Sequence, residues 1–185
     1  MTLLQRRRAL MAQPTGETWD FEWDASSGAV PSGMAYSGTP TFNSGIMTIA
    51  GSFSLDFDYA GDCIIEMELY ESNSFNNNNP QICVLKAEQA GAKYVLDLVS
   101  NRHYLAYNIG SGNTATDIKS NEMHHYRIIC NNGVFSLDVD RMQIASGGGA
   151  SSQYNIMTGI WCTSDKVSSS TARIKSIKFR RLHMT

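Results

Sequence analysis

The segment from residue 123 to residue 145 (MHHYRIICNNGVFSLDVDRMQIA) constrains the fold more than any other part of this chain. Apolar and polar residues alternate on both sides of Asn131-Asn132-Gly133, as they do in half-buried strands. Asn-Gly readily adopts the positive φ angles that a two-residue hairpin turn needs. The segment therefore predicts a β-hairpin, and it indicates an architecture rather than a function.

Period-two alternation recurs along most of the remaining chain. Trp19, Phe21 and Trp23 alternate with three carboxylates, and residues two apart share one face of a strand. Further strands are predicted at 41–42, 46–49, 63–70, 82–88, 94–99, 103–108, 158–162 and 174–182. Asn- and Gly-rich turns separate these strands, and no helix is indicated after residue 13. The chain is therefore expected to be all-β, an antiparallel two-sheet β-sandwich.

Length and composition indicate one domain. With 185 residues, of which 42% are hydrophobic and 17% charged, the chain is long enough for a two-layer core and too apolar for a disordered protein. We assign residues 14–185 to the β-sandwich. Residues 1–13 (MTLLQRRRALMAQ) form a short basic N-terminal arm, either helical or disordered until it binds a partner.

The cysteines and the N-terminal segment bear on localisation. The four cysteines, at positions 63, 83, 130 and 162, show neither CxxC spacing nor a zinc pattern with the histidines. The apolar run after Arg6-Arg7-Arg8 is too short for a signal peptide or a membrane span. We therefore expect synthesis in the cytoplasm without a signal peptide, with reduced thiols and no membrane-spanning segment.

The span from Trp19 to Leu182 resembles the laminin-G and concanavalin A-like superfamily. An opening aromatic-acidic strand, the strand pair YVLDLVSNRHYLAYN, the hairpin beginning HHYRI and a closing strand RIKSIKFRRL follow one another in that order. The sequence departs at Met123, where those domains often have Trp, and at Arg141, which stands where they often have Gly. The resemblance implies a jelly roll, a scaffold that hosts lectins, glycosidases and purely structural domains.

The basic opening that ends in RRRALM resembles the start of small structural proteins encoded by phages and prophages. This resemblance covers only the first dozen residues. It implies a virion- or tail-associated protein in which residues 1–13 bind other proteins of the assembly. Homo-oligomerisation is left open.

Charge is unevenly distributed along the chain. No Lys or Arg occurs between residues 9 and 85, whereas the segment 173–181 (RIKSIKFRR) carries five basic residues. A basic end is one sign of nucleic-acid binding. In jelly rolls of the type that this chain resembles, however, the first and last strands usually pair, so cross-strand ion pairs are favoured and no nucleic-acid partner is expected. The predicted pairs set Asp20, Glu22 and Asp24 opposite Lys178 and Arg180.

The strongest catalytic candidate is the segment 66–71 (EMELYE). Laminarinase-type glycosidases, which share the fold that the chain resembles, use an E-x-D-x-x-E motif whose outer carboxylates act as nucleophile and acid/base. Glu66 and Glu71 match the outer positions, while Glu68 replaces the central Asp and would misplace the orienting group. Alternation alone explains Glu66 and Glu68 as outward side chains, and we favour that explanation. An open cleft on the face that carries Glu66, Glu68 and Arg127 would favour sugar chemistry.

Sugar binding needs an aromatic surface with polar groups nearby. The candidate ligand-binding residues with this chemistry are His103, Tyr104, Tyr107, Asn108 and Trp161. Aromatic residues in a sandwich mostly belong to the core, so packing is the competing explanation.

Metal binding has one candidate. Asp56, Asp58 and Asp62 could supply the oxygen ligands that Ca²⁺ prefers. A solvated loop is favoured over a calcium site, so no cofactor is expected and calcium is left open. Adjacent His124 and His125 leave opposite faces of a strand and are poorly placed to chelate one ion.

We therefore expect a non-catalytic binding module for a glycan or another cell-surface ligand, within a phage or prophage structural protein. Two alternatives stay open. One is a small retaining glycosidase that acts on β-glucans through Glu66 and Glu71, and the other is a purely structural sandwich without a ligand.

Overall fold

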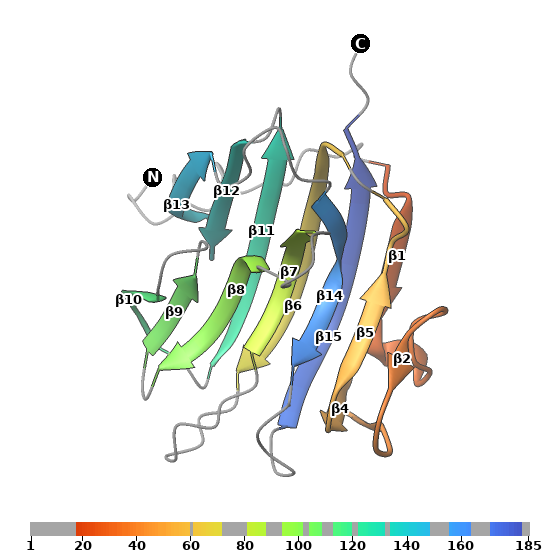
Figure 1. Cartoon of the computed structure of the whole chain (residues 1–185). Helices are drawn as coiled ribbons and strands as arrows, with labels where there is room; N and C mark the ends of the chain where they lie inside the picture. Colours follow the sequence, from red (N-terminus) through yellow and green to blue (C-terminus); the bar gives the residue numbers. More distant parts are fainter. Residues whose placement is uncertain are drawn as a thin grey trace, which may run out of the picture.

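The computed structural model describes the chain as two antiparallel sheets that lie face to face (Figure 1). The described residues are 18–59, 61–71, 81–87, 94–101, 104–108, 113–119, 122–131, 134–148, 156–163 and 171–182. The predicted arm, residues 1–13, lies outside them. An all-β, two-sheet β-sandwich is therefore confirmed, with one short 3-10 turn, η1 (Ala25–Ser27). No helix in the described part of the chain is long and apolar enough to span a membrane.

The eight-stranded sheet carries most of the described core. Its central strands are β6 and β15, and β1 pairs with β15 beside β4. In spatial order the strands are β13 (Met142–Gly148), β12 (Val134–Val139), β11 (Met123–Asn131), β6 (Cys63–Glu71), β15 (Thr171–Arg181), β4 (Ile46–Ala50) and β3 (Thr41–Asn43), with β1 (Phe21–Asp24) off this path.

The seven-stranded sheet lies in front of it in Figure 1. Its strands are, in order, β10 (Asn113–Lys119), β9 (Tyr104–Asn108), β8 (Tyr94–Asn101), β7 (Gln81–Ala87), β14 (Ile156–Thr163), β5 (Phe53–Asp56) and β2 (Ala35–Tyr36).

The core between the sheets follows the alternation of the sequence. Every second residue of β11 is buried, and the same holds along β12. Burying apolar side chains on one face is what fixes the register of such strands, because a slip by one residue would expose all of them. The side chains that are fully excluded from solvent include Met47, Ile49, Ile65, Met67, Leu69, Tyr126, Ile128, Leu137, Val139, Ile160, Ile174 and Ile177.

The predicted hairpin at residues 123–145 is confirmed. β11 and β12 pair in register up to Asn131 opposite Val134, and the turn residues 132–133 lie outside the described residues. A second two-residue turn, between β12 and β13, places Asp140 at φ 49° and Arg141 at φ 69°. Arg141 thus adopts a left-handed conformation, which residues other than Gly rarely adopt.

Asp140 anchors this second turn to β11. Its carboxylate accepts a hydrogen bond from the His125 backbone N–H at 3.0 Å, and its Oδ2 lies 2.7 Å from His124 Nδ1. The Asp140 N–H in turn donates to the His125 carbonyl at 2.8 Å. His124 is only 6% exposed, so this buried polar ring is satisfied from the turn.

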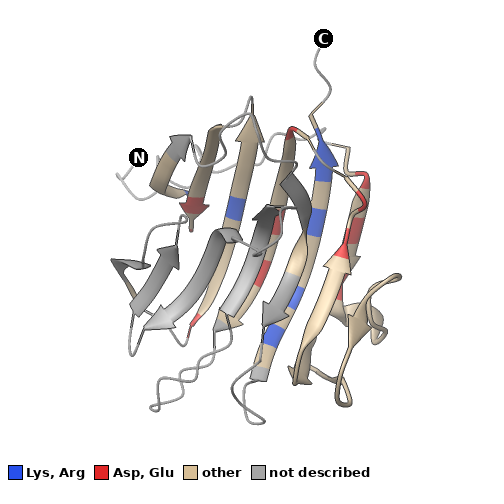
Figure 2. Cartoon of the chain, in the orientation of Figure 1, with Lys and Arg blue, Asp and Glu red and all other residues tan. Residues whose placement is uncertain are grey.

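The first and last described strands pair as predicted, but only part of the expected ion pairing follows. Glu22 is the register partner of Lys178 and forms an ion pair with it. Asp24 instead lies opposite Ser176, and its carboxylate accepts the Ser26 N–H at 2.8 Å. That hydrogen bond caps η1 and lowers the pKa of Asp24. Figure 2 shows the resulting band of acidic residues on β1 and β6 beside the basic residues of β15.

Gly38 occupies a position that has no room for a side chain. Its φ is 86°, and a Cβ would overlap the carbonyl oxygen of Ala50, whereas Gly33 has φ 81° and nothing within 4 Å of a Cβ. We expect Gly33→Ala to cost about 1 kcal/mol through backbone strain alone. Gly38→Ala should cost at least about 1 kcal/mol more, because the backbone must also move. Denaturant unfolding of both variants measures the difference, and equal losses would contradict the steric argument.

Candidate functional site

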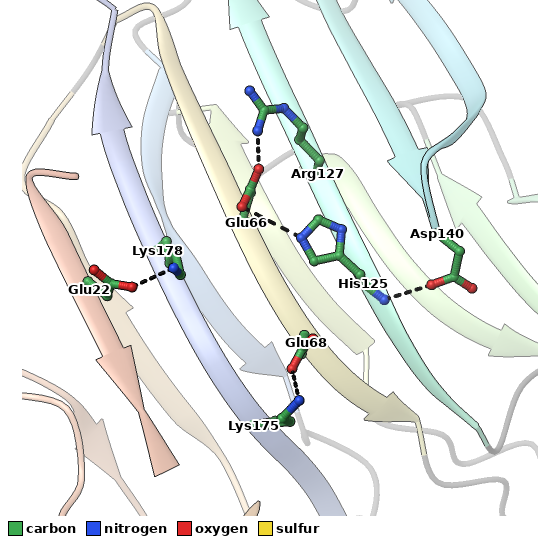
Figure 3. Close-up of polar contacts among 8 residues, drawn as sticks. All are labelled: Glu22, Glu66, Glu68, His125, Arg127, Asp140, Lys175 and Lys178. Carbon is green, nitrogen blue, oxygen red and sulfur yellow. Dashed lines mark hydrogen bonds and ion pairs between the residues drawn. The ribbon is translucent and has the colours of Figure 1, made fainter. Parts of the chain in front are cut away.

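Ion pairs connect four neighbouring strands across the outer face of the eight-stranded sheet (Figure 3). Ile65, Met67 and Leu69 point into the core, so Glu66 and Glu68 belong to the opposite face of β6. These residues form what we call the ion-pair cluster: Glu22 from β1, Glu66 and Glu68 from β6, His125 and Arg127 from β11, and Lys175 and Lys178 from β15.

Glu66 lies at the centre of the cluster and is only 5% exposed. Its register partner Arg127 forms an ion pair with Oε1, and His125 Nε2 lies 3.6 Å from Oε2. Burial by itself raises the pKa of Glu66. The polar contact with His125 and the positive charge of Arg127 outweigh burial, so the pKa of Glu66 is below its ordinary value. Glu66 is therefore a carboxylate whose ionised form is stabilised at both oxygens.

Lys175 reaches the cluster because β15 contains a bulge. Ile174 pairs with Leu69 and Ser176 pairs with the next residue of β6, Glu68, so Lys175 is the extra residue. Its Nζ lies 2.5 Å from Glu68 Oε2, and this hydrogen bond raises the pKa of Lys175. The bulge thus adds a cation to the outer face between two buried isoleucines of β15.

A pocket of about 260 Å³ opens over the cluster. Residues with carboxylate, ammonium and imidazole groups make up most of its lining, together with two residues of the core, Trp23 and Met67. Its lining residues are Glu22, Trp23, Asp24, Glu66, Met67, Glu68, His125, Lys175, Ser176 and Lys178. The face that carries Glu66 and Glu68 therefore has a pocket. A cleft on this face is the feature that we expected to favour sugar chemistry.

The register of β6 argues against the catalytic pair Glu66 and Glu71. β6 pairs with β11 without irregularity from Cys63 to Tyr70. Its pairing with β15 contains one bulge, and the extra residue of that bulge belongs to β15. Positions five apart in a regular strand belong to opposite faces. A retaining glycosidase needs both carboxyl groups about 5–5.5 Å apart on one face, and this strand lacks the bulge that would bring positions 66 and 71 together.

The four candidate ligand-binding residues that the structure describes, at positions 104, 107, 108 and 161, lie on the seven-stranded sheet and are divided between its faces. His103 lies outside the described residues. Direct cross-strand partners share a face, and the row that starts at buried Phe53 continues through Cys162, Ile82, Leu98 and Tyr107. The neighbouring row runs through Ser54, Trp161, Cys83, Asp97 and Asn108. Position 107 therefore belongs to the core face, whereas positions 104, 108 and 161 belong to the outer face.

The outer-face candidates are also far apart. β9, which holds positions 104 and 108, is separated from β14, which holds position 161, by β8 and β7. Three strand spacings amount to about 14 Å. The three positions are therefore spread over four adjacent strands of this face.

The three calcium candidates do not converge. The described residues contain no group of three or more His, Cys, Asp or Glu side chains that could hold a metal ion. Asp56 Oδ1 accepts the Asp58 N–H at 2.8 Å, and the Asp62 carbonyl accepts from the Leu182 N–H at 2.7 Å. These contacts are those of a structured loop.

Sequence reasoning singled out Glu66, Glu68 and Arg127 but missed the lysines and His125 as parts of one site. The signal was present in the closing segment, where Ile174 and Ile177 are both buried although they are three residues apart. Strict alternation cannot bury both, so that spacing indicates a bulge and an additional outward residue.

Comparisons with known proteins identify the fold. No protein-family model matches the sequence, and no curated protein matches it significantly. Among solved structures, the carbohydrate recognition domain of Emp47p matches with a TM-score of 0.59 at 12% identity, over 89% of this chain and 96% of that domain. A β-1,3-1,4-glucanase (lichenase) derived from a mouse hindgut metagenome matches with a TM-score of 0.58 at 10% identity, over 88% of this chain and 99% of the enzyme.

A sialidase supplies a partial match. Trypanosoma rangeli sialidase in complex with sialic acid gives a TM-score of 0.63 at 10% identity, over 81% of this chain and 28% of the sialidase chain. This chain thus corresponds to about a quarter of that protein. The neighbours are lectin, glucanase and sialidase structures with concanavalin A-like jelly rolls, and the predicted jelly roll is confirmed.

Proposed function

We propose that this chain is a non-catalytic carbohydrate-binding module that holds an uncharged glycan over the ion-pair cluster. The observation that carries the proposal is the polar pocket of about 260 Å³ on the outer face of the eight-stranded sheet. Carbohydrate recognition by Emp47p's domain, which has the same fold, supports the ligand class by analogy.

The chemistry of the pocket suits hydroxyl groups. Glu66 and Glu68 present acceptors, while Lys175 and Lys178 present donors a few ångströms away. Ionised carboxylates accept only and ammonium groups donate only, whereas a sugar hydroxyl does both. Hydroxyls on one ring can therefore bridge neighbouring carboxylates and ammonium groups without leaving a buried polar group unsatisfied.

The charge of the pocket favours an uncharged ligand. Four carboxylates line it, those of Glu22, Asp24, Glu66 and Glu68, against the two lysines and His125. A sulfated, sialylated or uronic-acid glycan would bring a further negative charge to this surface, which is unfavourable. Neutral glycans meet no such repulsion.

Trp19 adds an aromatic surface beside the pocket. Its ring is partly exposed, and both Lys178 Nζ and the Arg180 guanidinium carbon lie 5.7 Å from its centroid. An amphipathic aromatic ring next to converging polar groups is the arrangement that ligand sites commonly use. Trp19 thus supplies an aromatic surface, the role for which positions 104, 107 and 161 were predicted from the sequence.

Binding without catalysis is supported by the register of β6. A retaining glycosidase needs its nucleophile and its acid/base on one face of the sheet, whereas positions 66 and 71 belong to opposite faces of β6. The lowered pKa of Glu66 makes it a poor general acid, although an ionised carboxylate would suit a nucleophile.

A glycan array with the full chain tests the proposal. We expect binding to neutral glycans and weak or no binding to acidic ones. We also expect no effect of EDTA, because the described residues contain no group of three or more His, Cys, Asp or Glu side chains that could hold a metal ion. Binding to acidic glycans alone would overturn the charge argument, and loss of binding with EDTA would restore a role for calcium. No binding to any glycan on the array would overturn the proposal in favour of a purely structural sandwich.

Two substitutions on one strand locate the site. Lys178→Met removes a pocket donor while it keeps the length of the side chain, and one lost hydrogen bond should weaken glycan binding about tenfold. Arg173→Met changes the same face of β15 outside the pocket, where Arg173 stacks over Tyr70 at 4.5 Å. Titration calorimetry should find its affinity within about twofold of the unmodified chain. Equal affinities for the two variants would place the binding site elsewhere.

We further propose that the module belongs to a phage or prophage particle and is docked there by residues 1–13. This proposal rests on the sequence resemblance of the basic opening, and a short arm of this kind can fold on contact with its partner. Deletion of residues 1–13 should abolish incorporation into particles without changing glycan binding. Normal incorporation of the truncated chain would contradict the docking role.

A further inference from the structure

Cys63 and Cys130 are direct cross-strand partners. The β6–β11 ladder pairs eight consecutive residues and ends with Cys130 opposite Cys63. Both side chains belong to the core face, where Cys63 is 1% exposed and Cys130 is 4% exposed. Ile65 and Ile128, the next pair of partners on the same face, are also buried. Neither cysteine is part of a disulfide in this structure. Two thiols thus share one small buried space on neighbouring strands.

The register gives this pair the spacing of a disulfide. Opposed residues of antiparallel strands have Cα atoms about 4.5–5.5 Å apart, and disulfides span Cα separations of about 4.4–6.8 Å. Their side chains leave the same face, so the sulfur atoms can approach without a change of register. The pair also stands at the first residue of β6 and the last but one of β11, where strand ends open most readily.

We propose that Cys63 and Cys130 are a disulfide-forming site that a small-molecule disulfide, such as oxidised glutathione, converts to a cross-strand bond. One cysteine thiolate attacks a sulfur of the small disulfide, whose S–S bond breaks and releases one small thiol. The second cysteine thiolate then attacks the first cysteine's sulfur, which forms the protein disulfide and releases the second small thiol. Two electrons pass from the cysteines to the small disulfide, and the two cysteine protons end on the released thiols.

Burial controls when this exchange takes place. Desolvation raises the pKa of Cys130, and the thiolate is the form that reacts. The folded chain should therefore exchange slowly, whereas a chain that folds in an oxidising buffer should acquire the bond before the pair closes. The presence or absence of the bond would therefore show whether the chain folded under oxidising or reducing conditions.

The bond would strengthen the strand pair that carries the ion-pair cluster. Glu66 and Arg127 are register partners three residues along the same ladder, on its outer face. The bond would also close a loop of roughly 70 residues, which restricts the unfolded chain. We expect the oxidised protein to unfold about 5–10 °C higher than the reduced protein.

The test refolds the full chain from denaturant in a buffer of reduced and oxidised glutathione. Free thiols are then alkylated under denaturing conditions, and intact mass and non-reduced peptide maps are recorded. We expect two of the four cysteines to escape alkylation, and a single cross-linked peptide pair that contains Cys63 and Cys130. Reductant should remove the cross-link and the gain in melting temperature together.

Variants separate this pair from the other two cysteines. Cys83→Ser combined with Cys162→Ser keeps the proposed pair and should retain both the cross-link and the thermal shift. Cys63→Ala alone should lose both the cross-link and the thermal shift, and all three remaining thiols should be alkylated after oxidation. Alkylation of all four thiols in the oxidised unmodified chain, a cross-link to Cys83 or Cys162, or a lower melting temperature on oxidation would each overturn the proposal.

Discussion

Phe179→Ala is expected to lower the free energy of unfolding by about 3–5 kcal/mol, the largest loss that we expect from any single substitution considered. Phe179 is 2% exposed. Its ring stacks on Phe57 at a centroid distance of 4.3 Å and meets the edge of Tyr59 at 5.7 Å, and Phe57 in turn contacts Phe21 at 5.5 Å. Removing the ring leaves a cavity and breaks the aromatic pairs at once.

Denaturant unfolding of three variants checks this expectation. Phe179→Leu keeps much of the apolar volume and should cost less than half as much as Phe179→Ala. Val134→Ala, at a side chain that is 52% exposed, should change the free energy of unfolding by no more than about 0.5 kcal/mol. A loss at Phe179→Ala that is no larger than the loss at Val134→Ala would show that the aromatic cluster contributes little to stability.

The fold was predictable because the alternation of apolar and polar residues within each strand indicates which of its side chains are buried. Alternation in the segment 123–145 fixes which residues of two strands are buried, and Asn132-Gly133 fixes where the chain turns back. The pairing of the strand at 19–24 with the strand at 174–182 was also predicted, from the resemblance to jelly rolls in which the first and last strands pair. These features are local in sequence or depend on one long-range pairing.

The site was only partly predictable because it depends on strand order. Glu66 and Arg127 are sixty-one residues apart, and only the pairing of β6 with β11 sets them opposite each other. The position of Lys175 depends on a bulge between Ile174 and Ser176. Neither the order of strands nor the bulge follows from alternation within one strand.

The same limitation explains the choice of Tyr107 as a ligand-binding residue. Aromatic residues in a strand segment can belong to either face, and composition does not distinguish them. The face of position 107 follows only from the row of partners that ends at buried Phe53. Register across five strands was therefore needed to separate position 107 from positions 104 and 108.

Glu66→Gln is expected to cost about 1–3 kcal/mol of unfolding free energy at neutral pH and to abolish glycan binding. The substitution removes the negative charge between Arg127 and His125, and the partly buried guanidinium loses its counter-ion. Glu68→Gln is the matched control on the same strand and face. Its partner Lys175 is 47% exposed, so its loss should be no more than about 1 kcal/mol.

The pH dependence of these variants distinguishes a charge effect from a packing effect. Because the pKa of Glu66 is lowered in the folded state, its contribution is present above the pKa of the unfolded chain and is lost as pH falls through the folded pKa. The stability difference between the unmodified chain and Glu66→Gln should therefore shrink at acid pH, where both carry a neutral group at position 66. Urea unfolding at a series of pH values measures this difference. A difference that stays constant between neutral and acid pH would mean that shape, not the ion pairs, is what Glu66 contributes to the pocket.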